Sequence, residues 1–231
     1  MKTIGLLGGM SWESTTSYYQ HLNRLARDRL GGLHSAKLLI WSADFAAIAD
    51  FQAAGRWSDA ADLLVDAARR LEAAGADALL ICANTMHLVA NEVQAAVSVP
   101  LIHVADATAA RLTAAGARRP LLLATRFTME QAFYRDRLTA SGISAVVPPA
   151  DHRERLHAII FDELVQGRFA PESRREVAAI AARALADQGA DAVLLGCTEF
   201  ALLVSGDDFA APLFDTTAIH AEAAMTFALA D

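Results

Sequence analysis

The chain has only two cysteines among 231 residues, Cys82 and Cys197, and they lie far apart. A secreted domain of this size would not depend on one disulfide bridge, so we expect a cytoplasmic protein. The N-terminal apolar run is soon broken by Gly5, Gly8 and Gly9, which argues against a signal peptide. No segment approaches the roughly 18 uninterrupted apolar residues of a membrane helix, so we expect no membrane partner.

Basic patches are also missing. The 20 Lys and Arg are outnumbered by 27 Asp and Glu, which gives a net charge of −7 spread along the chain. Because phosphate neutralisation requires clustered Lys and Arg, nucleic acid is not an expected partner. The seven histidines are scattered, and His152 and His157 are five residues apart, a poor metal-binding spacing on a helix. The sequence therefore predicts no metal site.

A cofactor loop is absent as well. The glycines of Gly5–Gly9 do not match the Gly-x-Gly-x-x-Gly pattern, and no Lys-Ser or Lys-Thr follows them. The composition is 54% apolar and 20% charged, which is typical of a globular protein. We therefore expect a folded protein without a nucleotide cofactor.

One stretch occurs twice. Residues 75–86 and 189–200 both begin Gly-Ala-Asp-Ala, continue with a short apolar run and end in small and polar residues, 114 positions apart. This pattern is typical of a buried parallel strand whose carboxyl end leads into a helix. Ligands of open α/β sheets bind at such strand ends. In this register Cys197 is equivalent to Ala83, whereas Cys82 is equivalent to Gly196.

Strand and helix patterns alternate through both halves, which predicts parallel sheets. Expected strands include residues 3–7, 38–42, 101–104, 121–123, 145–147 and 212–215, besides the two repeat copies; expected helices include 14–30, 57–74, 86–96, 152–166, 171–188 and 218–229. The order repeats at a near-constant offset, and Tyr134 follows Tyr18 by 116 positions. We therefore expect a duplicated α/β fold whose halves are pseudo-symmetric.

Cys197 is the strongest candidate for chemistry. It follows a strand and precedes Thr198 and Glu199, so it could act as a base or a nucleophile, and we expect a helix N-terminus to lower its pKa. Cys82 lies one step earlier in its own copy. One step along a strand reverses the direction of the side chain, so we expect Cys82 to be a structural core residue.

Polar residues next to these strand ends form a second group of candidates. Asn84, Thr85 and Thr198 could donate hydrogen bonds to a carboxylate or a developing enolate, and they could equally be helix N-caps. Thr125 and Thr128 follow the first strand of the second half and have the same two interpretations. His87 is expected to be a hydrogen-bonded structural residue.

Several motifs together resemble the aspartate/glutamate racemase superfamily, near its broad amino-acid racemase branch. They are Ile4–Met10, Asn84–His87, Gly196–Glu199 and Phe214–His220. The resemblance implies two α/β halves with the active site in the cleft between them, residues 1–98 plus 211–231 forming the first and 99–210 the second. It also implies an amino-acid substrate, no pyridoxal phosphate and a homodimer.

The same resemblance suggests roles for individual residues. Family members move the α-proton with two cysteines, one on each face of the substrate. Cys197 matches one of them, and Asn84, Thr85 and Thr198 match residues that bind the carboxylate and amino groups. Met10 would contribute from the first loop, and Gln52 would reach the substrate side chain.

The sequence departs from the family pattern at three places. The first base is replaced by Ala83, with Cys82 shifted by one position. Aspartate-specific members carry an Arg between positions equivalent to Asp44 and Gly55 and a Lys near Phe161–Gly167, and both are missing here. A less acidic amino acid therefore fits as well as a dicarboxylic one.

Two other functions stay open. A single cysteine could protonate an enediolate formed without α-proton removal, as in a decarboxylase or isomerase of small diacids. The chain could also be a non-catalytic amino-acid binder that lost turnover with its first base.

Overall fold

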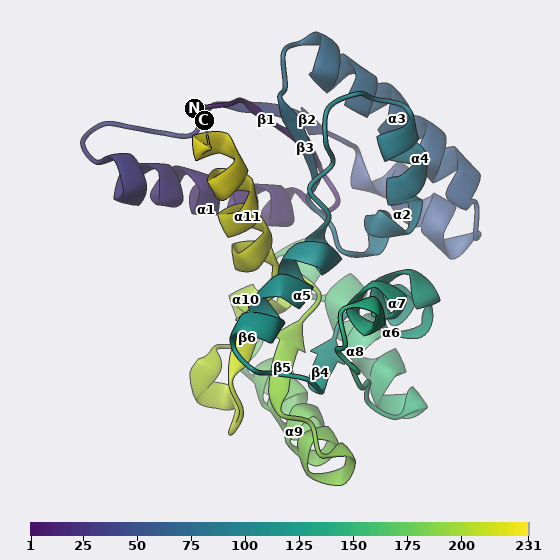
Figure 1. Ribbon diagram of the computed structural model, residues 1–231. Coiled ribbons are helices and arrows are strands. Elements are labelled where there is room, and N and C mark those ends of the chain that lie inside the picture. Colours follow the sequence, from purple (N-terminus) through teal and green to yellow (C-terminus); the bar gives the residue numbers. More distant parts are fainter. Residues whose placement is uncertain (231) are drawn as a thin grey trace. The chain divides into compact units, whose positions relative to one another are not determined.

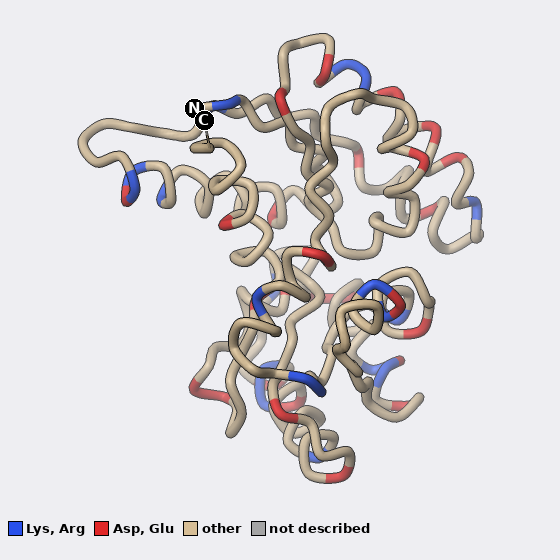
Figure 2. The backbone as a smooth tube through the Cα atoms, in the orientation of Figure 1, with Lys and Arg blue, Asp and Glu red and all other residues tan. Residues whose placement is uncertain are grey.

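The computed structural model describes residues 1–230, which divide into two compact units (Figure 1). Unit 1 consists of Met1–Val104 with the chain from His220 onward, and unit 2 consists of Ala105–Ile219. No helix among the described residues combines the length and the apolar character needed to span a bilayer. Figure 2 shows acidic and basic residues interspersed along the helices of both units.

Unit 1 contains a parallel sheet in the order β2–β1–β3. The strands are β1 (Ile4–Gly8), β2 (Leu38–Ser42) and β3 (Ala78–Ile81). Ile4 is paired with Leu38 on one side and with Ala78 on the other, and a bridge from Leu79 to Leu101 continues the sheet beyond β3. The helical elements that begin in this unit are α1 (Trp12–Leu30), α2 (Phe45–Ala53), α3 (Trp57–Ala73), η1 (Thr85–Val89), α4 (Ala90–Ala95) and α5 (Val104–Ala114).

Unit 2 repeats this order. Its parallel sheet consists of β4 (Pro120–Leu123), β5 (Ala192–Leu195) and β6 (Leu213–Asp215), and a bridge from Leu121 to Val146 extends it beyond β4. The helical elements that begin in this unit are α6 (Arg126–Glu130), α7 (Ala132–Ala140), α8 (Ala150–Asp162), η2 (Leu164–Gln166), α9 (Pro171–Gln188), α10 (Phe200–Leu203), η3 (Gly206–Asp208) and α11 (Thr216–Leu229). Each sheet thus places its segments in the order second, first, third, fourth, and the expected pseudo-symmetric parallel α/β fold is confirmed.

The sheet of unit 1 is covered on both faces (Figure 1). Leu6 and Leu80 point to a core shared with α1 and α11, whereas Leu7 and Ile81 point to a core shared with α3 and α4. This alternation follows from the pleat, since successive residues of a strand point to opposite faces. Strands buried on both faces need nearly continuous apolar sequence, and β1 and β3 have it.

Most expected elements were correct within a few residues, but three differ. Residues 101–104 form only a bridge at Leu101 before α5 begins, and residues 145–147 form only a bridge at Val146. Both segments lie at an outer position of their sheet, where a backbone partner is present on one side only. The segment after β2 was not among the expected helices, yet it forms α2, with Asp44 as the N-cap that accepts from the Ala46 amide.

The chain passes between the units at 104/105 and 219/220, and not at 98/99 and 210/211 as expected. Residues up to Val104 stay with unit 1 because the Ile102 amide donates to the Leu79 carbonyl. Residues 211–219 stay with unit 2 because β6 is paired with β5. In each half, therefore, the segment after the fourth strand position begins a helix that belongs to the other unit.

Candidate functional site

Polar residues follow all three strands of the unit 2 sheet. Thr125 comes two positions after β4, Cys197 two positions after β5, and Thr217 two positions after β6; all three are buried. The strands are adjacent and parallel, so their carboxyl ends lie along one edge of the sheet. This edge is the candidate site of unit 2.

Gly196 sets the position of Cys197. Its amide donates to the Leu123 carbonyl at 2.8 Å. A Cβ atom added there would lie 2.6 Å from Leu122 Cδ1 and 3.1 Å from Ala124 Cβ. A side chain at this position would require Leu122 and Ala124 to move, so glycine allows the chain to pass close to the end of β4 before the cysteine.

The thiol of Cys197 is hydrogen-bonded to a carboxylate. Cys197 Sγ donates to Glu199 Oε2 at 2.9 Å, and the two residues are only 6% and 4% exposed. A buried carboxylate needs hydrogen-bond donors, and the thiol supplies one of them. The thiol therefore donates its proton in a hydrogen bond to a carboxylate, in a place from which solvent is largely excluded.

This environment raises the pKa of Cys197 well above its usual value. Burial is the main cause, followed by the negative charge of Glu199 and its hydrogen bond to the thiol; the amides of Glu199 and Phe200 act in the opposite direction. The expectation that a helix N-terminus would lower this pKa was wrong. The helix, α10, has four residues, and desolvation and the carboxylate outweigh its amides.

Thr198 and Thr217 extend this polar edge. The Thr217 hydroxyl donates to the Thr198 hydroxyl at 3.2 Å, and the Thr217 amide donates to Asp215 at 2.8 Å. Glu199 and Thr217 were not among the expected site residues. The signal was in the sequence: Thr217 follows a strand that ends in Asp215, and Glu199 lies inside the second repeat copy.

Thr125 and Thr128 contact each other at the start of α6. Thr125 is the N-cap and accepts from the Thr128 amide at 3.3 Å, and their hydroxyl oxygens are 3.2 Å apart. The capping role that the sequence left open is therefore present. Their hydroxyls lie at the same sheet edge as Cys197, but they are engaged with each other.

In unit 1, Cys82 and Ala83 belong to opposite faces of the sheet. Cys82 is fully buried in the apolar core that contains Tyr18 and Leu80, and burial raises the pKa of its thiol. Ala83, 9% exposed, belongs to the core on the α3 face, together with Met10. The two sulfurs therefore have different surroundings: Cys197 contacts a carboxylate, and Cys82 contacts apolar side chains.

The other unit 1 candidates are buried near the ends of β1 and β3. Asn84 is 5% exposed and Thr85 7%, and Thr85 begins the short helix η1. Gln52, on α2, is 5% exposed, and its side-chain amide donates to Met86 Sδ at 3.2 Å. Gln52 is thus fixed by a residue of the η1 helix, which follows β3.

The loop after β1, which carries Met10, is held by hydrogen bonds. The Gly9 amide donates to Thr15 Oγ1 at 2.8 Å, and that hydroxyl donates to the Ser11 carbonyl at 3.1 Å. Gly9 has φ +82°, and a Cβ there would lie 2.3 Å from backbone atoms of Ala43. Only glycine fits both the conformation and the approach to the chain after β2.

Three histidines cluster in unit 1. The ring centroid of His87 is 4.6 Å from that of His103 and 5.6 Å from that of His220. His87 Nε2 accepts from the Val104 amide at 3.3 Å, so its Nδ1 carries the hydrogen that is donated to the Ala83 carbonyl at 2.9 Å. His87 is therefore a structural residue, and burial lowers its pKa well below the usual value, with His103 and His220 adding to the shift.

His220 is neutral for a similar reason. Its Nε2 donates to the Ile102 carbonyl at 2.6 Å, and its Nδ1 accepts from the Tyr18 hydroxyl at 2.8 Å. Burial lowers its pKa to about 4. Within residues 1–230, no group of three or more His, Cys, Asp or Glu side chains has an arrangement that could hold a metal ion.

Comparison with known proteins identifies the family. Residues 7–224 match the Asp/Glu/hydantoin racemase family. The chain belongs to this family. Its relatives include a candidate Asp/Glu racemase from Yersinia pestis, 47% identical with a TM-score of 0.91 over all of both chains. An aspartate racemase homologue from Pyrococcus horikoshii is 34% identical, with a TM-score of 0.86 over 99% of both chains.

A curated relative extends the comparison. The broad specificity amino-acid racemase of Bacillus subtilis is 23% identical to this chain over 235 residues, which cover 98% of each protein. The resemblance stated from the motifs is therefore confirmed, and the protein is a member of a family of racemases.

Proposed function

We propose that this protein is a cofactor-independent amino-acid racemase or epimerase that transfers the α-proton through Cys197. The observation that carries the proposal is the buried hydrogen bond, 2.9 Å long, between the Cys197 thiol and the Glu199 carboxylate. Family membership supports the reaction class, and the thiol–carboxylate pair supports the choice of base.

The pair can supply the base that the reaction needs. The thiol transfers its proton to Glu199, which leaves a thiolate and a neutral carboxylic acid. The thiolate then removes the α-proton of the substrate, and the electron pair moves into the substrate carboxylate to form an enediolate. Directed donors must stabilise this charge, and the family resemblance assigns that role to Asn84, Thr85 and Thr198.

No side chain proposed here supplies a proton on the opposite face of the substrate α-carbon. Ala83 occupies the position of the family's first base and has no proton to give, while Cys82 lies in the core of the other sheet face. The enzyme should therefore act unequally on the two enantiomers. The one whose α-hydrogen faces Cys197 exchanges readily, and the other depends on a slower donor such as water.

The test is α-proton exchange in heavy water, measured by NMR for each enantiomer separately. Wild type should exchange one enantiomer faster than the other, and Cys197→Ser should lose this exchange by about a thousandfold, in the range for a general acid–base group. Full exchange in Cys197→Ser would refute the proposal. Ser141→Ala, a change at an exposed turn of the same unit, is the control and should leave exchange unchanged.

A second pair of variants examines the other face. Ala83→Cys should raise exchange from the slow enantiomer and bring the two rates closer together. Cys82→Ala should leave both rates unchanged, because its sulfur lies in the apolar core. If wild type exchanges both enantiomers equally and Cys82→Ala abolishes one of them, Cys82 is the second base.

The substrate range is proposed to be broad. No Arg occurs between Asp44 and Gly55, and no Lys occurs in Phe161–Gly167, so the cations expected for a dicarboxylic side chain are missing. The Bacillus subtilis relative is named for broad specificity. A panel of L-amino acids with neutral, basic and acidic side chains tests this, and conversion of aspartate or glutamate alone would contradict it.

The single usable sulfur also favours a second candidate, a decarboxylase or isomerase of small diacids. In such a reaction Cys197 would only protonate an enediolate, and Ala83 would not matter. Conversion of a substituted malonate or of maleate, without exchange of any amino acid, would establish it. Thermal stabilisation by an amino acid without any turnover would instead indicate a non-catalytic binder.

The oligomer and the compartment complete the proposal. By family analogy the protein is a homodimer, which light scattering of the purified protein can test. Its two thiols are free and buried, which fits a cytoplasmic protein. Fractionation of the producing cells would test the location.

A further inference from the structure

Unit 2 contains a cavity of about 390 Å³. None of the residues assigned above to the catalytic site lines it. It lies where the loop before α8 meets the last turns of α9. Its wall includes Pro148 and Pro149, the side chains of His152 and Arg153 from α8, and Arg183 and Asp187 from α9. A space of this size accommodates a small organic ligand.

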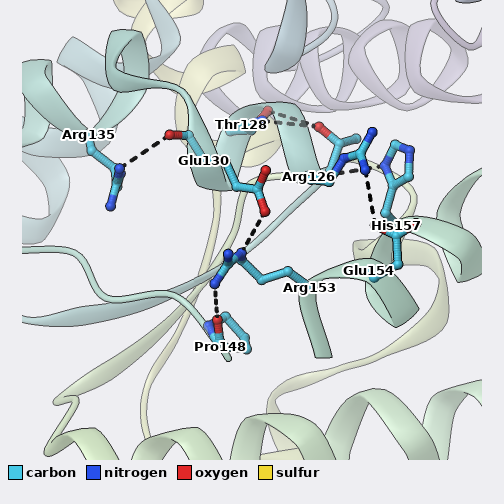
Figure 3. A network of polar contacts seen from close by, with 9 residues as sticks. Arg126, Thr128, Glu130, Arg135, Pro148, Arg153, Glu154 and His157 are labelled. Carbon is cyan, nitrogen blue, oxygen red and sulfur yellow. Dashed lines mark hydrogen bonds and ion pairs between the residues drawn. The ribbon is translucent and has the colours of Figure 1, made fainter. Parts of the chain in front are cut away.

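Arg153 is a fixed part of this wall. Its Nε donates to Glu130 Oε1 and its Nη1 donates to the Pro148 carbonyl, both at 2.9 Å (Figure 3). The side chain is 21% exposed. Because Glu130 offsets the charge of Arg153, Arg153 contributes mainly to the shape of the cavity and little to its net charge.

Arg183 and Asp187 bring two exposed charges of opposite sign to the cavity wall. They are four residues apart on α9, a spacing at which opposite charges usually meet. Among the described residues, however, neither has an ion pair or a side-chain hydrogen bond. The other two arginines of α9 are paired, Arg174 with Asp208 at 2.9 Å and Arg175 with Glu172 at 2.7 Å.

The α8 end of the cavity offers further donors. His152 Nδ1 is buried and has no hydrogen-bond partner among residues 1–230. Pro149 precedes the helix, and no side chain caps its first turn. Open amides at a helix start favour a negative group, so this end and Arg183 suit a carboxylate.

We propose that this cavity binds a small zwitterionic α-amino acid. The ligand carboxylate meets Arg183 and His152, and its ammonium group meets Asp187. A simple anion would engage only Arg183 and His152, and a simple cation would engage only Asp187; a zwitterion engages all three. The proposal does not depend on the chemistry at Cys197.

The experiment follows the imidazole NMR signals of His152 in the full-length Cys197→Ser protein, which prevents turnover. L-Alanine is titrated first, then propionate, which lacks the ammonium group. The His152 signals should shift saturably with L-alanine, and propionate should bind about tenfold more weakly. Arg183→Gln should weaken L-alanine binding about tenfold, and Asp187→Asn should remove the preference for alanine over propionate.

Arg175→Gln, an exposed arginine on the same helix, is the control and should leave binding unchanged. Three results would overturn the proposal. They are His152 signals that do not move up to about 50 mM L-alanine, well above a millimolar dissociation constant; equal binding by Arg183→Gln; and propionate binding as tightly as L-alanine.

Discussion

The sequences after β3 and β5 are equivalent, but the cysteine is the first residue after β3 and the second residue after β5. In unit 2 the strand end has Gly196 and then Cys197, whose thiol contacts Glu199. In unit 1 the equivalent positions are Cys82 and Ala83, and the sulfur packs among apolar side chains. Both strand ends contain one cysteine, but a shift of one residue along the strand gives the sulfur of Cys197 a carboxylate partner and leaves the sulfur of Cys82 without one.

The largest effect is expected from removing the acceptor that only unit 2 has. Glu199→Gln should lower turnover by about 10²–10³-fold, because the thiol can no longer pass its proton to a carboxylate. The Glu199 charge and hydrogen bond raise the pKa of Cys197, so their loss lowers that pKa and moves the pH–rate profile toward acid. Steady-state kinetics across pH measure both effects.

A merely structural role for Glu199 would lower turnover without moving the profile. Glu172→Gln, which changes an exposed carboxylate of the same unit, should show neither effect. An unchanged pH profile in Glu199→Gln would contradict the assignment.

The next effect concerns the sulfur of unit 1. Cys82→Ser should lower the free energy of unfolding by about 2 kcal/mol, because it buries a hydroxyl in a fully apolar core. The three tryptophans, at positions 12, 41 and 57, all lie in unit 1, so urea unfolding followed by their fluorescence reports on this unit. A cost near zero would mean that the side chain at 82 reaches a polar partner.

The free energy of unfolding of unit 1, measured in the same experiment, should depend on pH because of His220. His220 has a folded-state pKa of about 4, and an unfolded His titrates near 6.5. The folded state disfavours protonation, so stability is complete above about pH 6.5 and falls as the pH drops toward 4. At pH 5 the loss from His220 alone is about 2 kcal/mol.

The equivalent helices α5 and α11 begin 112 residues apart, so Thr108 is the residue of the duplication that is equivalent to His220. His220→Thr should therefore be less stable than wild type at pH 8 but should lose less stability between pH 8 and pH 5. An unchanged pH dependence in this variant would assign the acid sensitivity to other groups.

The smallest effect compares two equivalent tyrosines. Tyr18 donates to His220 Nδ1 at 2.8 Å, and Tyr134 donates to Thr108 Oγ1 at a weak 3.5 Å. Tyr18→Phe should cost about 1–2 kcal/mol because it leaves a buried ring nitrogen without a donor, whereas Tyr134→Phe should cost less than about 1 kcal/mol. Thermal unfolding of both variants measures the difference, and equal costs would show that the two bonds are equally strong.

Much of this fold could be predicted because its signals are local or repeated. Long helices such as α9 were found within a residue, since Pro171 starts it and Gly189 follows its end. The Gly-Ala-Asp-Ala repeat predicted β3 and β5. The helix α2 was missed because it has only nine residues.

The site was predicted less completely. Cys197 was chosen for its polar neighbours Thr198 and Glu199, and Cys82 was set aside by strand register, which needs only the two-residue period of a β-strand. The partner of the thiol did not follow, because a residue two positions away can point to either side of a turn. The direction of the Cys197 pKa shift was wrong mainly because burial, which depends on the tertiary fold, raises that pKa, and Glu199 adds to the effect.

The sequence by itself determined the parallel α/β class, the duplication and the register that separates Cys197 from Cys82, because these depend on periodicity and on short-range turn chemistry. Only the tertiary structure decided that the thiol meets Glu199, that His87, His103 and His220 cluster in unit 1, and at which residues the chain passes from one unit to the other. These features bring together residues that are distant in sequence or whose directions depend on the exact path of a turn. Their energies depend on burial, which no linear pattern specifies.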